Sequence, residues 1–185
     1  MRKLSSFLMT TLNGYDEGPN HELDWHNVNE EFNQFVLQQT GEADLLVFGR
    51  VTYEMMAAYW PTPEAIESDP AKAALMNSLP KMVVSRTLDR ADWANTRLIR
   101  DEVTATLTEL KRQPGKDPTI LGSSNLTASL LRSSLVDELR ILVNPVVLGS
   151  GRPVLETADR TCLKLLRSRR FSSGNVLLCY EPAAC

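Results

Sequence analysis

The sequence has few of the residues that build metal sites or disulfide frameworks. Its 185 residues include three cysteines, Cys162, Cys179 and Cys185, and two histidines, His21 and His26. No two cysteines have a C-x-x-C spacing, and the histidines are five apart, which is not the spacing of a helical metal pair. We therefore expect no metal site and no disulfide framework. Cys162 and Cys179 stand among apolar residues, so we expect both to be small core side chains.

Long apolar runs and long basic runs are missing as well. No apolar run approaches the ~20 residues of a spanning helix, and the start, Met1-Arg2-Lys3-Leu4, leads into a polar-interrupted segment. We therefore expect neither a membrane span nor a signal peptide, and a cytoplasmic location. Lys plus Arg is 20 and Asp plus Glu is 23, so the net charge is −3, and the pI is about 5.5. This balance disfavours nucleic-acid binding through a basic patch.

What remains is the composition of an ordinary globular protein, with 43% hydrophobic and 23% charged residues. The length suits one domain over residues 1–185. Apolar patterning predicts a fold in which strands and helices alternate. The expected strands are residues 3–12, 44–48, 81–85, 97–100, 119–121 and 139–143, and the expected helices are residues 28–39, 51–58, 70–78, one from Asp101 as N-cap, and one around 126–131.

The two proline-containing turns of residues 59–69 predict a loop, and the last two apolar segments, residues 163–166 and 175–181, predict a closing antiparallel hairpin. The fold class that follows is α/β: a three-layer sandwich in which helices cover both faces of a mixed, mostly parallel sheet.

Three of the expected strands end in residues suited to phosphate binding. They are Gly49-Arg50-Val51-Thr52, Ser85-Arg86-Thr87 and Gly122-Ser123-Ser124-Asn125. Ligands of open α/β sheets collect at the carboxyl ends of the strands, where helix starts offer free N–H groups. Neither a G-x-G-x-x-G helix start nor a P-loop is present, so another arrangement must supply the site.

Several segments resemble the dihydrofolate reductase superfamily, in the order that the superfamily has them. The segments are Phe48-Gly49-Arg50-Val51-Thr52-Tyr53-Glu54, the first strand ending in Asn13-Gly14, Leu23-Asp24-Trp25, Lys81-Met82-Val83-Val84-Ser85-Arg86 and Gly122-Ser123-Ser124-Asn125-Leu126. Leu135-Val136-Asp137-Glu138-Leu139 followed by Pro145-Val146-Val147-Leu148-Gly149-Ser150-Gly151 is similar to the branch that contains the reductase domain of riboflavin biosynthesis. The resemblance covers almost the whole chain and implies a dihydrofolate reductase-like fold.

The resemblance implies NADPH as cofactor. Gly49, Arg50 and Thr52 would contact its phosphates and ribose, and Ser85 with Arg86 would hold the 2′-phosphate. The diphosphate would lie on Gly122, Ser123, Ser124, Asn125 and Leu126, at a helix N-terminus. Two positions depart from the superfamily pattern: Asn13 stands where an aspartate is frequent, and Ser123 stands where many members have a second glycine.

A reductase also needs a proton donor. In folate reductases a carboxylate five residues after a tryptophan has this role, and counting from Trp25 gives Glu30, with Asp24 and Glu31 as neighbouring candidates. A first-turn carboxylate also complements the helix dipole, which is the simpler interpretation. Trp25 and Asn13 are the expected substrate contacts.

The resemblance therefore implies an NADPH-dependent reductase similar to 5-amino-6-(5-phosphoribosylamino)uracil reductase. The alternatives are a dihydrofolate, pterin or other small-molecule reductase of the same fold, and a non-catalytic NADPH-binding protein. The H-x-E…P-C-x-x-C signature of the zinc deaminase that is often fused to the riboflavin enzyme is absent. The superfamily resemblance also implies a homodimer formed through the C-terminal strands.

Overall fold

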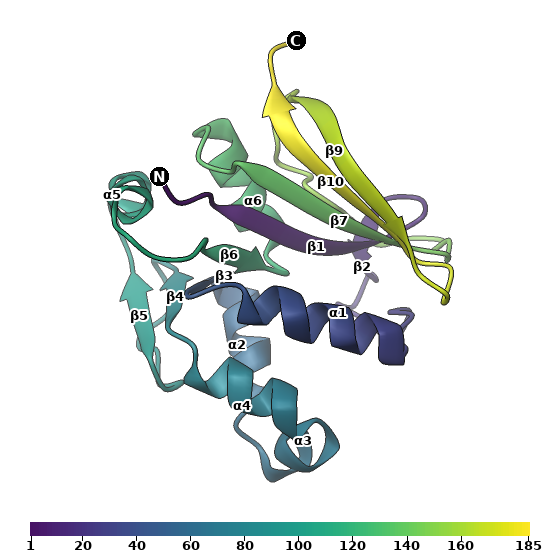
Figure 1. The fold of residues 1–185 in the computed structure, drawn as a ribbon, viewed down its shortest axis with the longest axis horizontal. Helices are drawn as coiled ribbons and strands as arrows, with labels where there is room; N and C mark the ends of the chain where they lie inside the picture. The colour runs from purple at the N-terminus through teal and green to yellow at the C-terminus, as the bar shows by residue number, and fades with distance from the viewer.

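One eight-stranded sheet organises the computed structural model, which describes residues 1–185 (Figure 1). The strand order is β5-β4-β3-β6-β1-β7-β10-β9. All strands from β5 to β7 in this order run parallel, and β10 and β9 follow as an antiparallel hairpin. The bounds are β1 Ser5–Thr11, β3 Leu46–Gly49, β4 Lys81–Val84, β5 Thr96–Ile99, β6 Thr119–Leu121, β7 Glu138–Asn144, β9 Cys162–Arg170 and β10 Val176–Ala183.

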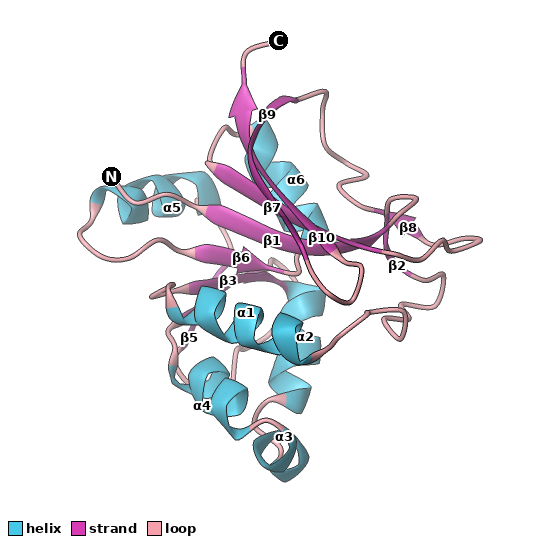
Figure 2. Cartoon of the chain, turned by 45° about the vertical axis from the view of Figure 1, so that its right-hand side comes forward, coloured by secondary structure: helices cyan, strands magenta, loops and turns pink.

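Helices lie on both faces of this sheet, as Figure 2 shows. They are α1 Glu30–Gly41, α2 Arg50–Tyr59, α3 Pro63–Ser68, α4 Pro70–Ser78, α5 Val103–Arg112 and α6 Ser124–Arg132. A separate two-stranded ribbon, β2 Tyr15–Glu17 with β8 Arg152–Pro153, stands beside the end of β1. No helix is long and apolar enough to cross a membrane.

Alternation along the strands decides which side chains face each helical layer. Val47, Met82 and Ile120 point to one face, where they pack with Leu107 of α5 and Leu130 of α6. The residues next to them in the strands point to the other face. There Phe48 and Val83 pack with Tyr53 of α2 and Met76 of α4, and Phe7 and Leu142 pack with Phe32 of α1. The three-layer α/β sandwich with its C-terminal hairpin is thus confirmed.

Two local predictions were wrong. Residues 63–68, expected within a loop, form α3, because Pro63 occupies the first helical turn and the Thr62 hydroxyl accepts a hydrogen bond from Ala65 N–H. Asp101 is not the N-cap of α5. That position belongs to Glu102, whose φ of 54° turns the chain and leaves Asp101 outside the helix. The ribbon strands β2 and β8 were not predicted.

The expectation for Cys162 was also wrong, since it forms a disulfide with Cys185. Ala183 pairs with Cys162 in the β10–β9 register, so the chain end brings Cys185 back beside it. Sequence spacing could not show this, because the pairing depends on the hairpin register. Cys179 is a buried free thiol, as predicted, and burial raises its pKa.

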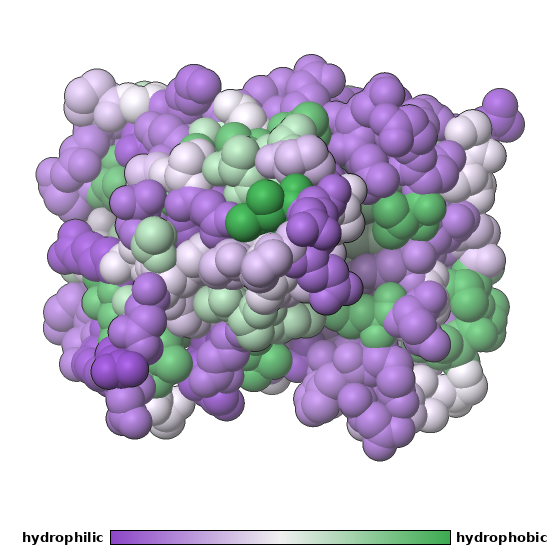
Figure 3. Space-filling model, turned by 90° about the horizontal axis from the view of Figure 1, so that it is seen from below, coloured by the Kyte–Doolittle hydropathy of each residue, from purple (hydrophilic) through white to green (hydrophobic).

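Exposed apolar side chains occur both on the helices and on the edge strand of the sheet. The face seen in Figure 3 is mostly hydrophilic, with hydrophobic side chains in small separate patches. The edge strand β9 exposes three leucines, Leu163, Leu165 and Leu166, at 39%, 50% and 42%. β9 also carries Lys164, Arg167, Arg169 and Arg170, and its outer edge has unpaired backbone groups with which a further strand can pair.

Candidate functional site

Helices α2, α5 and α6 follow parallel strands and begin at the carboxyl edge of the sheet. Their N-terminal N–H groups receive no side-chain cap, whereas α1, α3 and α4 are capped by Asn29, Thr62 and Asp69. The first N–H groups of any helix lack partners within the helix. The carboxyl edge therefore presents uncapped, partially positive helix ends, which suit an anion.

The starts of α2 and α6 are tied to each other through Ser123. Its hydroxyl accepts a hydrogen bond from Gly49 N–H at 2.9 Å and donates one to Leu121 O at 3.2 Å. Thr52 adds a second link, from its hydroxyl to Gly122 O at 3.2 Å. The serine that replaces a glycine of the superfamily pattern thus holds two predicted phosphate turns in register. Its hydroxyl thus donates one hydrogen bond and accepts one within the chain.

Gly122 has a backbone conformation that only glycine adopts at low cost, with φ at +63°. A Cβ there would lie 3.3 Å from Thr52 Cγ2, so it would also crowd the turn. The neighbouring Ser124 is buried, and its hydroxyl accepts a hydrogen bond from Leu155 N–H at 2.8 Å. Asn125 is exposed, and Leu126 packs against the core under α6. This turn can therefore offer backbone N–H groups rather than serine hydroxyls.

Ser85 and Arg86 have different roles in the turn that they form. The Ser85 hydroxyl accepts hydrogen bonds from the N–H groups of Thr87 and Leu88, at 3.2 and 3.0 Å, so it shapes the turn. The Arg86 side chain is 84% exposed and has only a loose contact, 3.8 Å to Asp101. β4 lies beside β3, so Arg86 stands one strand away from Gly49 on the same edge. It is a free cation at the place where the sequence predicts one.

The predicted proton donors lie on exposed positions. Glu30 begins α1 and accepts a hydrogen bond from Gln34 of the same helix at 2.9 Å, while Asp24 lies in the preceding loop. The third candidate, Glu31, is committed elsewhere. The Ser172 N–H and hydroxyl and the Arg169 guanidinium bind its carboxylate and lower its pKa to about 2.

The two predicted substrate contacts are each held by local hydrogen bonds. Trp25 is half-buried, donates from Nε1 to Glu22 O at 3.1 Å, and meets His26 edge-on with ring centroids 4.5 Å apart. Asn13 donates from Nδ2 to Leu148 O at 2.7 Å, and its Oδ1 accepts from Leu148 N–H at 3.2 Å. This two-way contact needs a donor and an acceptor. An amide supplies both, whereas an ionised carboxylate at position 13 would supply only acceptors.

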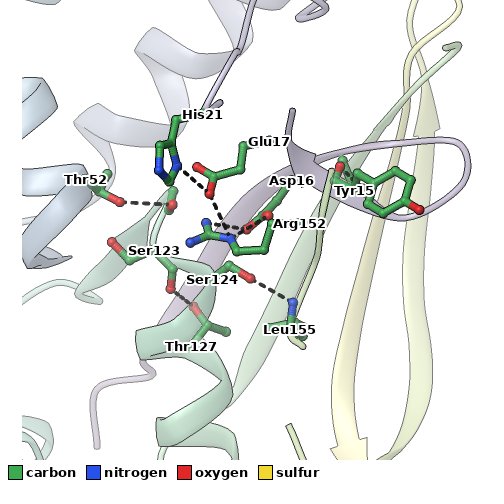
Figure 4. A network of polar contacts seen from close by, with 12 residues as sticks. Tyr15, Asp16, Glu17, His21, Thr52, Ser123, Ser124, Thr127, Arg152 and Leu155 are labelled. Carbon is green, nitrogen blue, oxygen red and sulfur yellow. Dashed lines mark hydrogen bonds and ion pairs between the residues drawn. The ribbon is translucent and has the colours of Figure 1, made fainter. Parts of the chain in front are cut away.

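Sequence reasoning missed a charged network in the β2–β8 ribbon, drawn in Figure 4. Arg152 donates to both oxygens of Asp16, from Nε at 3.1 Å and Nη2 at 3.0 Å, and its Nε lies 3.2 Å from Glu17 Oε1. His21 Nδ1 lies 2.8 Å from that same Glu17 oxygen, and His21 has a φ of 66°. Burial disfavours the charge of Arg152, but the hydrogen bond and charge of Asp16 outweigh it and raise its pKa.

This ribbon is linked by a hydrogen bond to the start of α6. The Leu155 N–H that binds Ser124 comes two residues after β8, and in Figure 4 the Arg152 guanidinium extends from the ribbon toward the turn that carries Ser123 and Ser124. Gly151 permits the close approach of the two strands, because a Cβ there would lie 2.4 Å from Glu17 O. The only sequence signal was an arginine directly after Gly149-Ser150-Gly151. Strands of three and two residues are too short to show a period.

The fold is dihydrofolate reductase-like. The dihydrofolate reductase of Enterococcus faecalis, solved in complex with NADP(H), superposes with a TM-score of 0.65 at 16% identity, covering 98% of this chain and 97% of that one. The family model of the RibD C-terminal domain matches residues 2–177, and the chain belongs to that family.

Two further relatives cover nearly the full length. The uncharacterized protein YyaP of Bacillus subtilis is 33% identical over 183 residues, which are 97% of this chain and 95% of that protein. The structure of a putative riboflavin biosynthesis protein from Shewanella sp. PV-4 has a TM-score of 0.73 at 22% identity, and covers 98% of this chain and 99% of that one.

Proposed function

We propose that this protein is an NADPH-dependent reductase of a small molecule, resembling 5-amino-6-(5-phosphoribosylamino)uracil reductase of riboflavin biosynthesis. One observation carries the proposal: the uncapped starts of α2 and α6 are tied together through Ser123, one strand away from the free guanidinium of Arg86. An anionic ligand with several phosphates satisfies all of these groups at once. Membership of the RibD C-terminal domain family agrees with it.

The residues present fit a dinucleotide phosphate. Gly122 keeps the α6 turn free of a Cβ, so the N–H groups of residues 123–126 are open to a diphosphate. Gly49, Arg50 and Thr52 offer the corresponding contacts at α2. Arg86 supplies the cation for a 2′-phosphate, which distinguishes NADPH from NADH, and Ser85 orients it by shaping its turn. Bound NADPH supplies the hydride.

On the substrate side, Trp25 offers an aromatic wall and Asn13 fixes the loop at Leu148. Glu30 and Asp24 form no ion pair, so either can supply the proton that accompanies a hydride. A hydride source and a proton source together can reduce a C=N or C=O bond. A flat heterocyclic substrate, as in the pterin or pyrimidine reductases, suits the aromatic wall.

A second candidate function is NADPH binding without catalysis. It is favoured by Asn13, since the superfamily's frequent aspartate is replaced by an amide that binds the backbone of Leu148 in both directions. Turnover of a substrate panel distinguishes the two functions, because both require the same cofactor site.

A homodimer through β9 is part of the proposal. Leu163, Leu165 and Leu166 are exposed on the edge strand of the sheet, next to unpaired backbone groups of that edge. Pairing with a second copy would cover these leucines. Light scattering that gives the monomer mass of 20.7 kDa would contradict the dimer.

Thermal unfolding with NADPH, NADH and no ligand tests the cofactor. Ligand at 100 times its dissociation constant stabilises a protein by ~2.7 kcal/mol, which at roughly 2–4 °C per kcal/mol is a shift of several degrees. We expect that shift with NADPH. In Arg86→Gln the NADPH dissociation constant should rise about tenfold or more, because a charge-assisted phosphate contact is worth roughly 1.5–3 kcal/mol, while NADH binding stays as it was. Equal loss for both dinucleotides would remove Arg86 from 2′-phosphate recognition, and no shift with either would refute the proposal.

A further inference from the structure

We infer that Arg152 is an additional phosphate-binding residue of this site, and that it contacts the diphosphate shared by NADPH and NADH. The inference rests on the proposed function, since it concerns the same cofactor. It adds a cation from the β2–β8 ribbon to the contacts that the sequence motifs predict. Arg152 lies outside every segment that carries the resemblance to the superfamily.

Arg152 is placed before any ligand arrives. Both carboxylate oxygens of Asp16 accept hydrogen bonds from one edge of the guanidinium, from Nε at 3.1 Å and from Nη2 at 3.0 Å. Glu17 Oε1 lies 3.2 Å from Nε on the same edge. Both carboxylates are buried, with side chains 8% and 10% exposed, while the Arg152 side chain is 29% exposed. The two carboxylates therefore lie on the buried side of the guanidinium, and its other side faces solvent.

The other edge of the guanidinium is free. Arginine carries five N–H donors, and Nη1 of Arg152 donates no hydrogen bond within the chain. In Figure 4 the guanidinium lies on the side of the ribbon that faces Ser123 and Ser124, and Leu155 holds the following residues against Ser124. The unused N–H groups of Nη1 and Nη2 form the end fork of the guanidinium, and the geometry of this fork matches a phosphate.

A cation in the ribbon also offsets part of its negative charge. Asp16 and Glu17 stand at the same edge as the predicted phosphate turns, and they would repel a diphosphate. Glu156 adds a third negative charge near Arg152, and His21 faces Glu17 from the loop that follows β2. Without Arg152 the ribbon would present an anionic wall to an anionic ligand. With it, the ribbon is partly neutralised and has donors to offer.

A purely structural ion pair is the competing explanation, and Asp16 distinguishes the two. If Arg152 only fastens β2 to β8, removing either partner should weaken ligand binding in the same way, by loosening the ribbon. If Arg152 binds phosphate, the two changes have opposite signs. Asp16→Asn removes a repelling charge and keeps the arginine, whereas Arg152→Gln removes the arginine and leaves the repelling charges.

The experiment measures the equilibrium binding of NADPH and of NADH to the full chain by calorimetry. The variants are Arg152→Gln, Arg152→Lys and Asp16→Asn, with Arg86→Gln as the matched control. We expect Arg152→Gln to raise both dissociation constants by the same factor, about tenfold or more, and to make binding less sensitive to salt. The dissociation constants of Arg152→Lys should lie between those of the parent chain and those of Arg152→Gln, because lysine keeps the positive charge but lacks the planar fork of donors. Asp16→Asn should bind both dinucleotides as well as the parent chain or better.

Each other outcome is decisive. Parent-level binding in Arg152→Gln, or a loss in Asp16→Asn equal to that in Arg152→Gln, overturns the inference and leaves the proposed function intact. A loss confined to NADPH in Arg152→Gln would place the arginine at the 2′-phosphate and also overturn it. If the parent chain binds neither dinucleotide, the proposed function and the inference fall together. Circular dichroism reports whether each variant folds. If Arg152→Gln does not fold, the changes in dissociation constant of Arg152→Lys and Asp16→Asn still test the inference.

Discussion

The amino and carboxyl ends of the parallel strands both carry charged side chains, but the charges are used differently. At the amino end, Lys111 Nζ donates to Leu135 O at 3.0 Å and lies 2.6 Å from Asp137. Asp137 in turn accepts a hydrogen bond from Leu4 N–H at 2.7 Å, and Arg2 forms an ion pair with Asp44. These cations are buried, and each forms an ion pair with a carboxylate inside the chain.

At the carboxyl end the donors are open. Arg86 is almost fully exposed, Arg152 has an unused Nη1, and α2 and α6 begin without side-chain caps. Arg2 and Lys111 are therefore buried and paired at the amino end, whereas Arg86 and Arg152 keep exposed surface at the carboxyl end, which suits the ligand that we propose. The difference is the general one for open α/β sheets, whose ligands collect at the carboxyl ends.

The largest effect on this comparison should come from Asp137→Ala. It leaves the buried Lys111 ammonium without its carboxylate and Leu4 N–H without its acceptor. Breaking a buried ion pair costs roughly 3–5 kcal/mol, and because Asp137 is one-third exposed we expect about 3 kcal/mol. Urea unfolding measures it. The NADPH dissociation constant of the folded fraction should stay unchanged.

A paired variant checks the cause. Lys111→Met combined with Asp137→Asn keeps an acceptor for Leu4 and removes both charges, so it should recover much of the lost stability. If the double variant is as unstable as Asp137→Ala, or if Asp137→Ala weakens NADPH binding, the division of roles between the two ends is wrong.

Sequence reasoning found the features that repeat along the chain. Alternating apolar residues and helical periods predicted both helical layers, and the Ser-Arg and Gly-Ser-Ser turns were predicted at strand ends because small and basic residues cluster there. These predictions need only local order and the rules of sheet topology.

Features that depend on three-dimensional register were out of reach. Arg152 and Asp16 are 136 residues apart, and their contact exists because Gly151 lets two very short strands approach. The Cys162–Cys185 bond depends on the hairpin register. The hydroxyl of Ser123 is another case, since its acceptance of Gly49 N–H could be known only once two turns were placed side by side. No spacing in the sequence carries such information.

The pH dependence of stability gives a further test at the amino end, through the buried side chain of Lys81. Lys81 is buried, donates to Asn77 O and Leu79 O, and lies 4.5 Å from the centroid of the Trp93 ring. Burial lowers the pKa of Lys81 from 10.5 to about 8. Between these values the unfolded chain binds more protons than the folded chain, so this residue makes stability rise with pH.

Lys81→Met removes that dependence. The difference in unfolding free energy between the parent chain and Lys81→Met should therefore shift in favour of the parent chain as pH rises from 7.5 to 10, with a slope of at most one proton. Urea unfolding at several pH values measures it, and the other lysines cancel in the difference. A difference that is flat with pH would mean that the buried ammonium titrates as in water.

The smallest effect on stability should come from the carboxyl end. Arg50 and Glu54 form an i, i+4 pair at 2.9 Å, with both side chains about half exposed. Such pairs contribute only ~0.3–0.5 kcal/mol, so Arg50→Ala should leave the unfolding free energy within about 0.5 kcal/mol of the parent value. Because Arg50 stands at the uncapped start of α2, the same change should weaken NADPH binding measurably. Calorimetry and urea unfolding on one preparation give both quantities. A variant that loses more than about 1 kcal/mol of stability and binds NADPH as before would show that the carboxyl-end charges are structural, as those at the amino end are.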